Sequence, residues 1–255
     1  MPRYEETRVD VNGVDTAVLT AGSGDPLVFF HGGGVVEGPD CFLPLAERFH
    51  LVFPYHPGFG SAASNPAIGG LDDWVAHYVA LFDLLGIGEV ALMGHSLGGW
   101  LGARFTLAHP DRVRRLVLAS PFGLDGGAHP PANFAAVAPE DVYGYLTRDA
   151  SIFEGRVPSP LTEEFLAARM REGHAIGQVA VGPFDPALAE RLRQLTTPTL
   201  LQWGDDDRTV PVQHAPLWEA ALPDVTSTIY PGLGHLLFWE DRVPVDDAGE
   251  FLTAR

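Results

Sequence analysis

The hydrophobic positions of this chain fall into short continuous runs, separated by longer stretches in which apolar side chains recur at helical spacing. The continuous runs cover residues 27–30, 51–53, 90–93, 116–119 and 199–203, and a last, more polar run covers 227–230. Helical spacing is found in residues 41–49, 72–85 and 100–108. Continuous apolar strands that alternate with helices are typical of a parallel sheet with both faces covered.

The N-terminal segment has a different pattern. Val9, Val11, Val14 and Val18 alternate with polar residues around Asn12-Gly13, and Asn-Gly between alternating apolar positions favours a β-hairpin. A hairpin adds an antiparallel edge to the sheet. The predicted fold class is therefore α/β, with a mostly parallel mixed sheet and helices on both of its faces.

One long segment interrupts the alternation of strands and helices. Between Asp125 and Leu195 no convincing strand is found, and helical patterns occur near 139–147, 161–172 and 185–195. About 70 residues are too many for a plain connection in a compact domain. We predict that residues 1–125 and 196–255 form the core, and that residues 126–195 form a helical cap inserted into it.

Composition and charge exclude several classes of function. The formal net charge is −17, which disfavours binding to nucleic acid or to anionic membranes. All 16 basic residues are arginine, so Schiff-base chemistry on lysine and a P-loop are excluded. No apolar run approaches the ~20 residues of a membrane span. The charged N-terminus is not typical of a secretory signal, and the single Cys41 fits a cytoplasmic protein.

The strongest chemical motif is Gly94-His95-Ser96-Leu97-Gly98-Gly99. It follows an apolar run and precedes a helical pattern, which is the context that a G-x-S-x-G nucleophile elbow requires. Side chains at 94 and 98 would collide in so sharp a turn. The motif indicates Ser96 as a nucleophile and the Leu97 N–H as an oxyanion donor. A glycine-rich turn with an incidental serine is the alternative.

A second glycine cluster, His31-Gly32-Gly33-Gly34, follows an earlier strand. Glycine lets the backbone approach a substrate closely, so we expect a second oxyanion donor here. Gly33 is favoured, with Gly34 as a further substrate-binding candidate. His31 is interpreted as a structural histidine, and so is His95.

A serine nucleophile needs a base, and the base needs an orienting acid. His235 follows the last strand on a loop that could overhang Ser96, and His56 is its one serious rival among the ten histidines. Several carboxylates follow strands and could be the acid. The residues themselves leave open Asp125, Asp205, Asp206 and Asp207.

Over nearly its whole length the chain resembles the α/β-hydrolase superfamily. The matching segments are His31-Gly32-Gly33, Pro57-Gly58-Phe59-Gly60, the motif at 94–99, His109–Val113, Trp203–Pro211 and Gly234-His235. The resemblance implies the chain order Ser, Asp, His, and the superfamily's spacing selects Asp207. A serine at the nucleophile position argues against the dehalogenase and epoxide-hydrolase branches, which use aspartate there.

The main prediction is a serine hydrolase that cleaves a small or medium apolar ester through an acyl-enzyme, without a metal or an organic cofactor. Its partner would be a small-molecule substrate, and the sequence predicts no oligomeric state. Aromatic residues of the cap and nearby loops favour an apolar pocket, with Phe122 and Leu236 as candidate binding residues. The remaining aromatic residues are Phe134, Tyr143, Tyr145, Phe153, Phe165 and Phe184.

Two other functions remain open. Residues 161–169 are similar to a cap helix of the ring-fission-product hydrolases, which implies a carbon–carbon bond hydrolase of a vinylogous diketone acid with Arg169 in its site. His95 and Leu236 depart from that group, which often has Asn and Trp there. A simple ester gives Arg169 no charged partner, so the ester hypothesis expects this arginine to face solvent. The third hypothesis is a non-hydrolysing ligand receptor.

Overall fold

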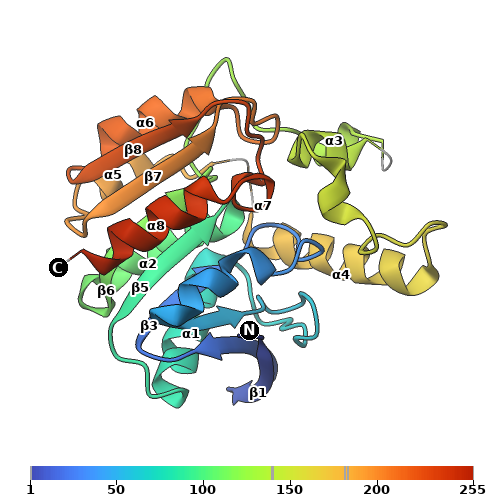
Figure 1. Cartoon of the computed structure of the whole chain (residues 1–255), viewed down its shortest axis with the longest axis horizontal. Coiled ribbons are helices and arrows are strands. Elements are labelled where there is room, and N and C mark those ends of the chain that lie inside the picture. Colours follow the sequence, from blue (N-terminus) through green and yellow to red (C-terminus); the bar gives the residue numbers. More distant parts are fainter. Residues whose placement is uncertain (1, 139–140, 181, 183, 255) are drawn as a thin grey trace.

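The computed structural model describes residues 2–138, 141–180, 182 and 184–254. Its eight-stranded sheet has the order β1-β2-β4-β3-β5-β6-β7-β8, with helices on both faces (Figure 1), and confirms the predicted fold class. The strands are β1 Glu5–Val11, β2 Val14–Gly22, β3 Asp25–Phe30, β4 Phe49–Pro54, β5 Val90–His95, β6 Val113–Ala119, β7 Thr199–Gly204 and β8 Val225–Tyr230.

The antiparallel part of the sheet is confined to the N-terminal edge. β1 pairs with β2 and β2 with β4 in antiparallel register, whereas all other neighbours are parallel. Asn12 and Gly13 both have positive φ, 54° and 85°, as a two-residue type I′ turn requires. The predicted hairpin is confirmed.

The helices lie in two layers, because successive strand residues point to opposite faces. Val28 and Phe30 of β3 belong to the core cluster that includes residues of α1, α2, α5 and α6, whereas Leu27 and Phe29 belong to the cluster that includes residues of η1, α7 and α8. The helices of these layers are η1 Asp40–Glu47, α1 Leu71–Leu84, α2 Leu97–Ala108, α5 Leu188–Leu192, α6 Ala215–Ala221, α7 Leu237–Glu240 and α8 Val243–Thr253. Two short 3₁₀ helices complete this part of the chain: η2 Pro110–Arg112 precedes β6, and η5 Val212–His214 precedes α6.

Two sequence predictions of helices need correction. The segment predicted as a helix over 41–49 is the 3₁₀ helix η1, and it contains Pro44, which has no N–H for a regular α-helical ladder. The pattern at 185–195 produces only the five-residue α5. No helix of the described residues is long and apolar enough to cross a membrane, and the cytoplasmic location stays a prediction.

Residues 126–195 lie in the connection between β6 and β7. Besides α5 they contain η3 Phe134–Ala136, α3 Val142–Leu146, η4 Ala150–Phe153 and α4 Glu163–Val179. Residues 139–140 of the first predicted pattern lie outside the described residues. α4 is longer than predicted, and the Thr162 hydroxyl caps its start by accepting the Phe165 N–H at 3.2 Å. α3 and α4 lie beside one end of the sheet (Figure 1). The division into core and cap domains stays a prediction.

Candidate active site

Ser96 lies at a sharp turn between β5 and α2. Its φ of 56° and ψ of −120° are costly for a side chain that is not glycine, and its N–H is fixed by the Ala119 carbonyl at 2.9 Å. A Cβ on Gly94 would lie 2.3 Å from the Gly98 oxygen, and one on Gly98 would lie 2.0 Å from the Phe30 oxygen. The predicted collisions are therefore confirmed, and the two glycines allow the turn that presents Ser96.

Two backbone segments lie next to Ser96. Leu97 is the first residue of α2, whose N-terminus carries the positive end of the helix dipole. The loop after β3 supplies the other side. A Cβ on Gly32 would lie 3.2 Å from Ser96 Cβ, whereas one on Gly33 would first meet Ile176 of α4 at 3.3 Å. Gly32 thus approaches Ser96 closely, and the donor role of Gly33 stays a prediction.

His235 and Asp207 form a buried pair. The His235 Nδ1–H donates to Asp207 Oδ2 at 2.8 Å, and the two side chains are 2% and 0% exposed. The other carboxylate oxygen accepts the N–H groups of Thr209 and Val210, both at 2.8 Å. These bonds fix the carboxylate and select the imidazole tautomer whose Nε2 can accept a proton.

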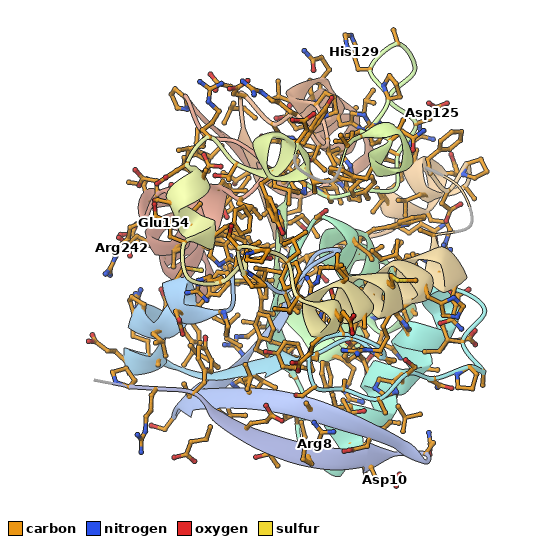
Figure 2. The ribbon with its side chains drawn as sticks, turned by 90° about the vertical axis from the view of Figure 1, so that its right-hand side faces the viewer. Arg8, Asp10, Asp125, His129, Glu154 and Arg242 are labelled. Carbon is orange, nitrogen blue, oxygen red and sulfur yellow. The ribbon has the colours of Figure 1, made fainter. Side chains whose placement is uncertain are left out.

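The competing carboxylates have other partners. Asp205 accepts the Gly232 N–H at 2.7 Å, and Asp206 pairs with Arg148 and Arg208. Asp125 is exposed at the periphery of the molecule, where it accepts the Gly127 N–H (Figure 2). Among the four candidates, only Asp207 bonds to His235, as the superfamily spacing implies.

The rival base His56 is fully buried and bonded on both ring nitrogens. Its Nε2–H donates to the His31 carbonyl at 2.9 Å, and its Nδ1 accepts the Tyr78 hydroxyl. His31 in turn accepts the His56 N–H and donates to the Gly32 carbonyl at 2.8 Å. Burial lowers the pKa of both histidines. These rings stay neutral and brace the glycine loop, as predicted for His31.

His95 holds the backbone of His235 in place. Its Nε2–H donates to the His235 carbonyl at 2.8 Å, and burial, helped by the nearby His235, lowers the pKa of His95. A neutral ring with that tautomer leaves Nδ1 as an acceptor. This structural role agrees with the sequence interpretation.

Ser96 and His235 both line one cavity, whose volume is about 830 Å³. Its wall includes the predicted residues Gly33, Gly34, Leu97, Phe122, Arg169 and Leu236. Of the other aromatic residues proposed for a pocket, Phe134, Tyr143 and Phe153 line the cavity. Asp207 lies behind His235 and does not line it. The structure thus brings together all the predicted site residues.

The cavity also holds two carboxylates that the sequence analysis missed, Glu37 and Glu172. Glu172 Oε1 lies 2.7 Å from Arg169 Nη2, with side chains that are 3% and 29% exposed. Burial raises the pKa of Glu172 to about 7, against the effect of Arg169. The spacing of three residues between Arg169 and Glu172 was the signal that could have indicated this pair.

Comparison with known proteins now identifies the family. Residues 27–248 match the family described as "Alpha/beta hydrolase family". The chain belongs to the α/β-hydrolase family. Two relatives similar to this chain are each named 2-hydroxy-6-oxononadienedioate/2-hydroxy-6-oxononatrienedioate hydrolase. The protein of Burkholderia vietnamiensis is 28% identical over 92% of this chain and 87% of its own length, and that of Cupriavidus pinatubonensis is 31% identical over 93% and 88%.

A solved structure is also similar to this chain over nearly its whole length. The serine hydrolase involved in carbazole degradation (CarC enzyme) superposes with a TM-score of 0.81, at 26% identity over 99% of this chain and 100% of that one. No group of three or more histidine, cysteine or carboxylate side chains in the described part of the chain could hold a metal ion.

Proposed function

We propose that this α/β-hydrolase cleaves a carbon–carbon bond in a vinylogous diketone acid of the 2-hydroxy-6-oxo-dienoate class. The observation that carries the proposal is the position of Arg169. The ester hypothesis expects this guanidinium in solvent, whereas it lines the cavity into which Ser96 opens. There it can donate charge-assisted hydrogen bonds to a substrate carboxylate. The names of the relatives support the same reaction class.

The proposed chemistry uses the residues in the following roles. Ser96 Oγ attacks the ketone carbon at position 6, and its proton passes to His235 Nε2. The N–H groups of Leu97 and Gly33 bind the oxyanion. The reacting form is the 2,6-dioxo tautomer of the substrate, in which the enol proton has already moved to carbon 5. When the intermediate collapses, the bond between carbons 5 and 6 breaks, and its electron pair delocalises over carbons 5 to 2 onto the oxygen at carbon 2, which gives a dienolate. His235 returns the serine proton to this dienolate oxygen, and water then hydrolyses the acyl group from Ser96.

Arg169 contributes by stabilising negative charge. The substrate carboxylate is negatively charged at every step of the reaction. When the carbon–carbon bond breaks, the departing fragment also gains the negative charge of a dienolate. Arg169 Nε is buried and lacks a hydrogen-bond partner among the described residues, so this donor is available to a ligand. An unpaired buried donor costs about 1–3 kcal/mol, and a carboxylate would remove that cost.

The ester hydrolysis predicted first from the sequence has less support than this carbon–carbon reaction, because the relatives are named for the latter. The receptor hypothesis stays a prediction. It would require ligand binding without turnover by the native enzyme, which the experiment below measures directly.

The test compares two substrates on one enzyme. We expect the native protein to cleave 2-hydroxy-6-oxo-6-phenylhexa-2,4-dienoate with a kcat/KM at least 100-fold above that for p-nitrophenyl butyrate. Arg169→Met should lower the dienoate value about 30-fold, as loss of a charge-assisted bond of about 2 kcal/mol implies. It should change the ester value by less than about threefold. Dienolate absorbance and p-nitrophenol release give the rates.

Arg193→Met is the matched control, because Arg193 is exposed outside the cavity, and it should leave both rates unchanged. Fast ester hydrolysis with no cleavage of the dienoate would overturn the proposal in favour of an esterase. Equal losses on both substrates in Arg169→Met would show that Arg169 only supports the fold.

A further inference from the structure

The charged groups of the cavity come from two separate parts of the chain. Among the described lining residues, the carboxylates are Glu37 and Glu172, and the only guanidinium is that of Arg169. Glu37 follows the glycine loop after β3, whereas Arg169 and Glu172 lie on α4. Most other lining side chains are apolar. A cavity of about 830 Å³ therefore offers one strong cation to an anionic substrate.

Arg169 is shared between the two carboxylates. It pairs with Glu172 at 2.7 Å, and its charge also acts on Glu37, where it opposes the effect of burial. Burial raises the pKa of Glu37, and the negative charge of Glu37 contributes to the raised pKa of Glu172. The three side chains thus form one interacting cluster of two carboxyl groups and one guanidinium, in which negative charge is in excess when both carboxyl groups are ionised.

No other arginine lines the cavity among the residues that the structure describes. Arg156 acts on Glu37 from outside the lining, and its Nη2 lies 3.4 Å from Asp40 Oδ2. Arg171 of α4 points to the neighbouring loop, where it donates to the carbonyls of Gly58 and Gly60. A first substrate carboxylate can bind Arg169, but a second one finds no further guanidinium among the described lining residues and adds to the negative charge of Glu37 and Glu172.

We infer that Glu37 and Glu172 are specificity-determining residues, which restrict this cavity to substrates with a single carboxylate and an apolar remainder. An unpaired carboxylate is costly to bury, and nearby negative charge adds to that cost. Under the proposed function, on which this inference rests, the preferred substrate is a 2-hydroxy-6-oxo-dienoate with an alkyl or aryl group at carbon 6. The dioates that name two of its relatives are disfavoured.

The experiment measures binding without turnover, so that it does not depend on the reaction. Two saturated ligands differ by one carboxylate: 6-oxo-6-phenylhexanoate and its 4-carboxyphenyl counterpart. Their dissociation constants are measured by titration calorimetry on a Ser96→Ala background at pH 8, above the pKa of about 7 of Glu172. We expect the monocarboxylate to bind at least tenfold more tightly. In Glu37→Gln and in Glu172→Gln, each of which removes one negative charge, this ratio should fall to about threefold or less.

Glu164→Gln is the control. It removes the same charge from the same helix at an exposed position outside the lining and should leave the ratio unchanged. Equal affinities for the two ligands, or tighter binding of the dicarboxylate, would overturn the inference. So would an unaltered ratio in both glutamine variants. Cleavage of the phenyl dienoate decides the proposed function separately, since a reaction without selectivity and selectivity without the reaction are distinct results.

Discussion

Asp207 and Glu172 are both buried carboxylates near the cavity, but the two regions of the molecule hold them differently. Asp207, at a strand end, accepts two backbone N–H groups at 2.8 Å besides its bond to His235. Glu172, on α4, has the Gly60 N–H at 3.5 Å and otherwise depends on the Arg169 side chain. The strand ends use the backbone, whereas α4 uses side chains.

This difference separates chemistry from selection. Backbone donors are fixed by the sheet and its turns, so they suit groups that must keep one geometry during proton transfer. Side-chain partners on a helix can be exchanged for a ligand, as Arg169 would exchange part of its pairing for a substrate carboxylate. The expected effects of substitution therefore differ in kind between the two regions.

The largest effect is expected at the strand ends. Asp207→Asn should lower kcat on any substrate by about 10⁴-fold, because the amide stabilises the wrong imidazole tautomer and cannot stabilise an imidazolium. Asp125→Asn should retain the native rate, since Asp125 only caps a surface turn. Steady-state kinetics on variants with native circular dichroism checks this prediction. A comparable loss in Asp125→Asn with an active Asp207→Asn would reverse the assignment.

The pH dependence of stability should report on α4. The pKa of Glu172 rises from 4.5 to about 7 on folding, so the folded chain holds this proton more tightly than the unfolded chain. The stabilisation is complete below about pH 4.5 and is lost as pH rises to about 7, at a cost of about 3 kcal/mol.

Urea unfolding at pH 5 and at pH 8 gives the free energy of unfolding of the native protein and of Glu172→Gln. The fall in this free energy between the two pH values should be larger for the native protein, and the difference measures the loss. Glu164→Gln, which removes an exposed charge from the same helix, should follow the native protein. The same fall in the free energy of unfolding for all three proteins would mean that folding does not raise the pKa of Glu172. The contrast with the carboxylate of Asp207 would then disappear.

The smallest effect is expected from the connection between α4 and the core. Arg171→Ala removes the hydrogen bonds to the Gly58 and Gly60 carbonyls, at 3.0 and 2.8 Å. We expect KM for the dienoate to rise about fivefold, a loss of about 1 kcal/mol, with kcat nearly unchanged because the strand-end groups stay in place. Arg171→Lys should recover only part of the affinity, since lysine lacks the guanidinium fork. A fall in kcat at constant KM would contradict this separation.

Some of this protein was determined by sequence alone. The apolar runs and the Asn12-Gly13 turn predicted the mixed sheet, because strand burial and hairpin turns leave strong local patterns. The elbow at Ser96 was equally local, since its glycines are required within six consecutive residues. His235 was singled out by its place after the last strand, and Asp207 needed the superfamily spacing because three neighbouring aspartates share the same local pattern.

Only the tertiary structure decided what faces the substrate. Leu166, an apolar residue in the first half of α4, is 45% exposed, and the buried residues of the helix are Glu172, Ala175 and Val179. Because α4 places Arg169 and Glu172 at the wall of the cavity, hydrophobic periodicity alone does not indicate the inner face of this helix. The meeting of Glu37 with Arg169 and Glu172 joins segments more than 130 residues apart, and it follows from where α4 packs over the glycine loop.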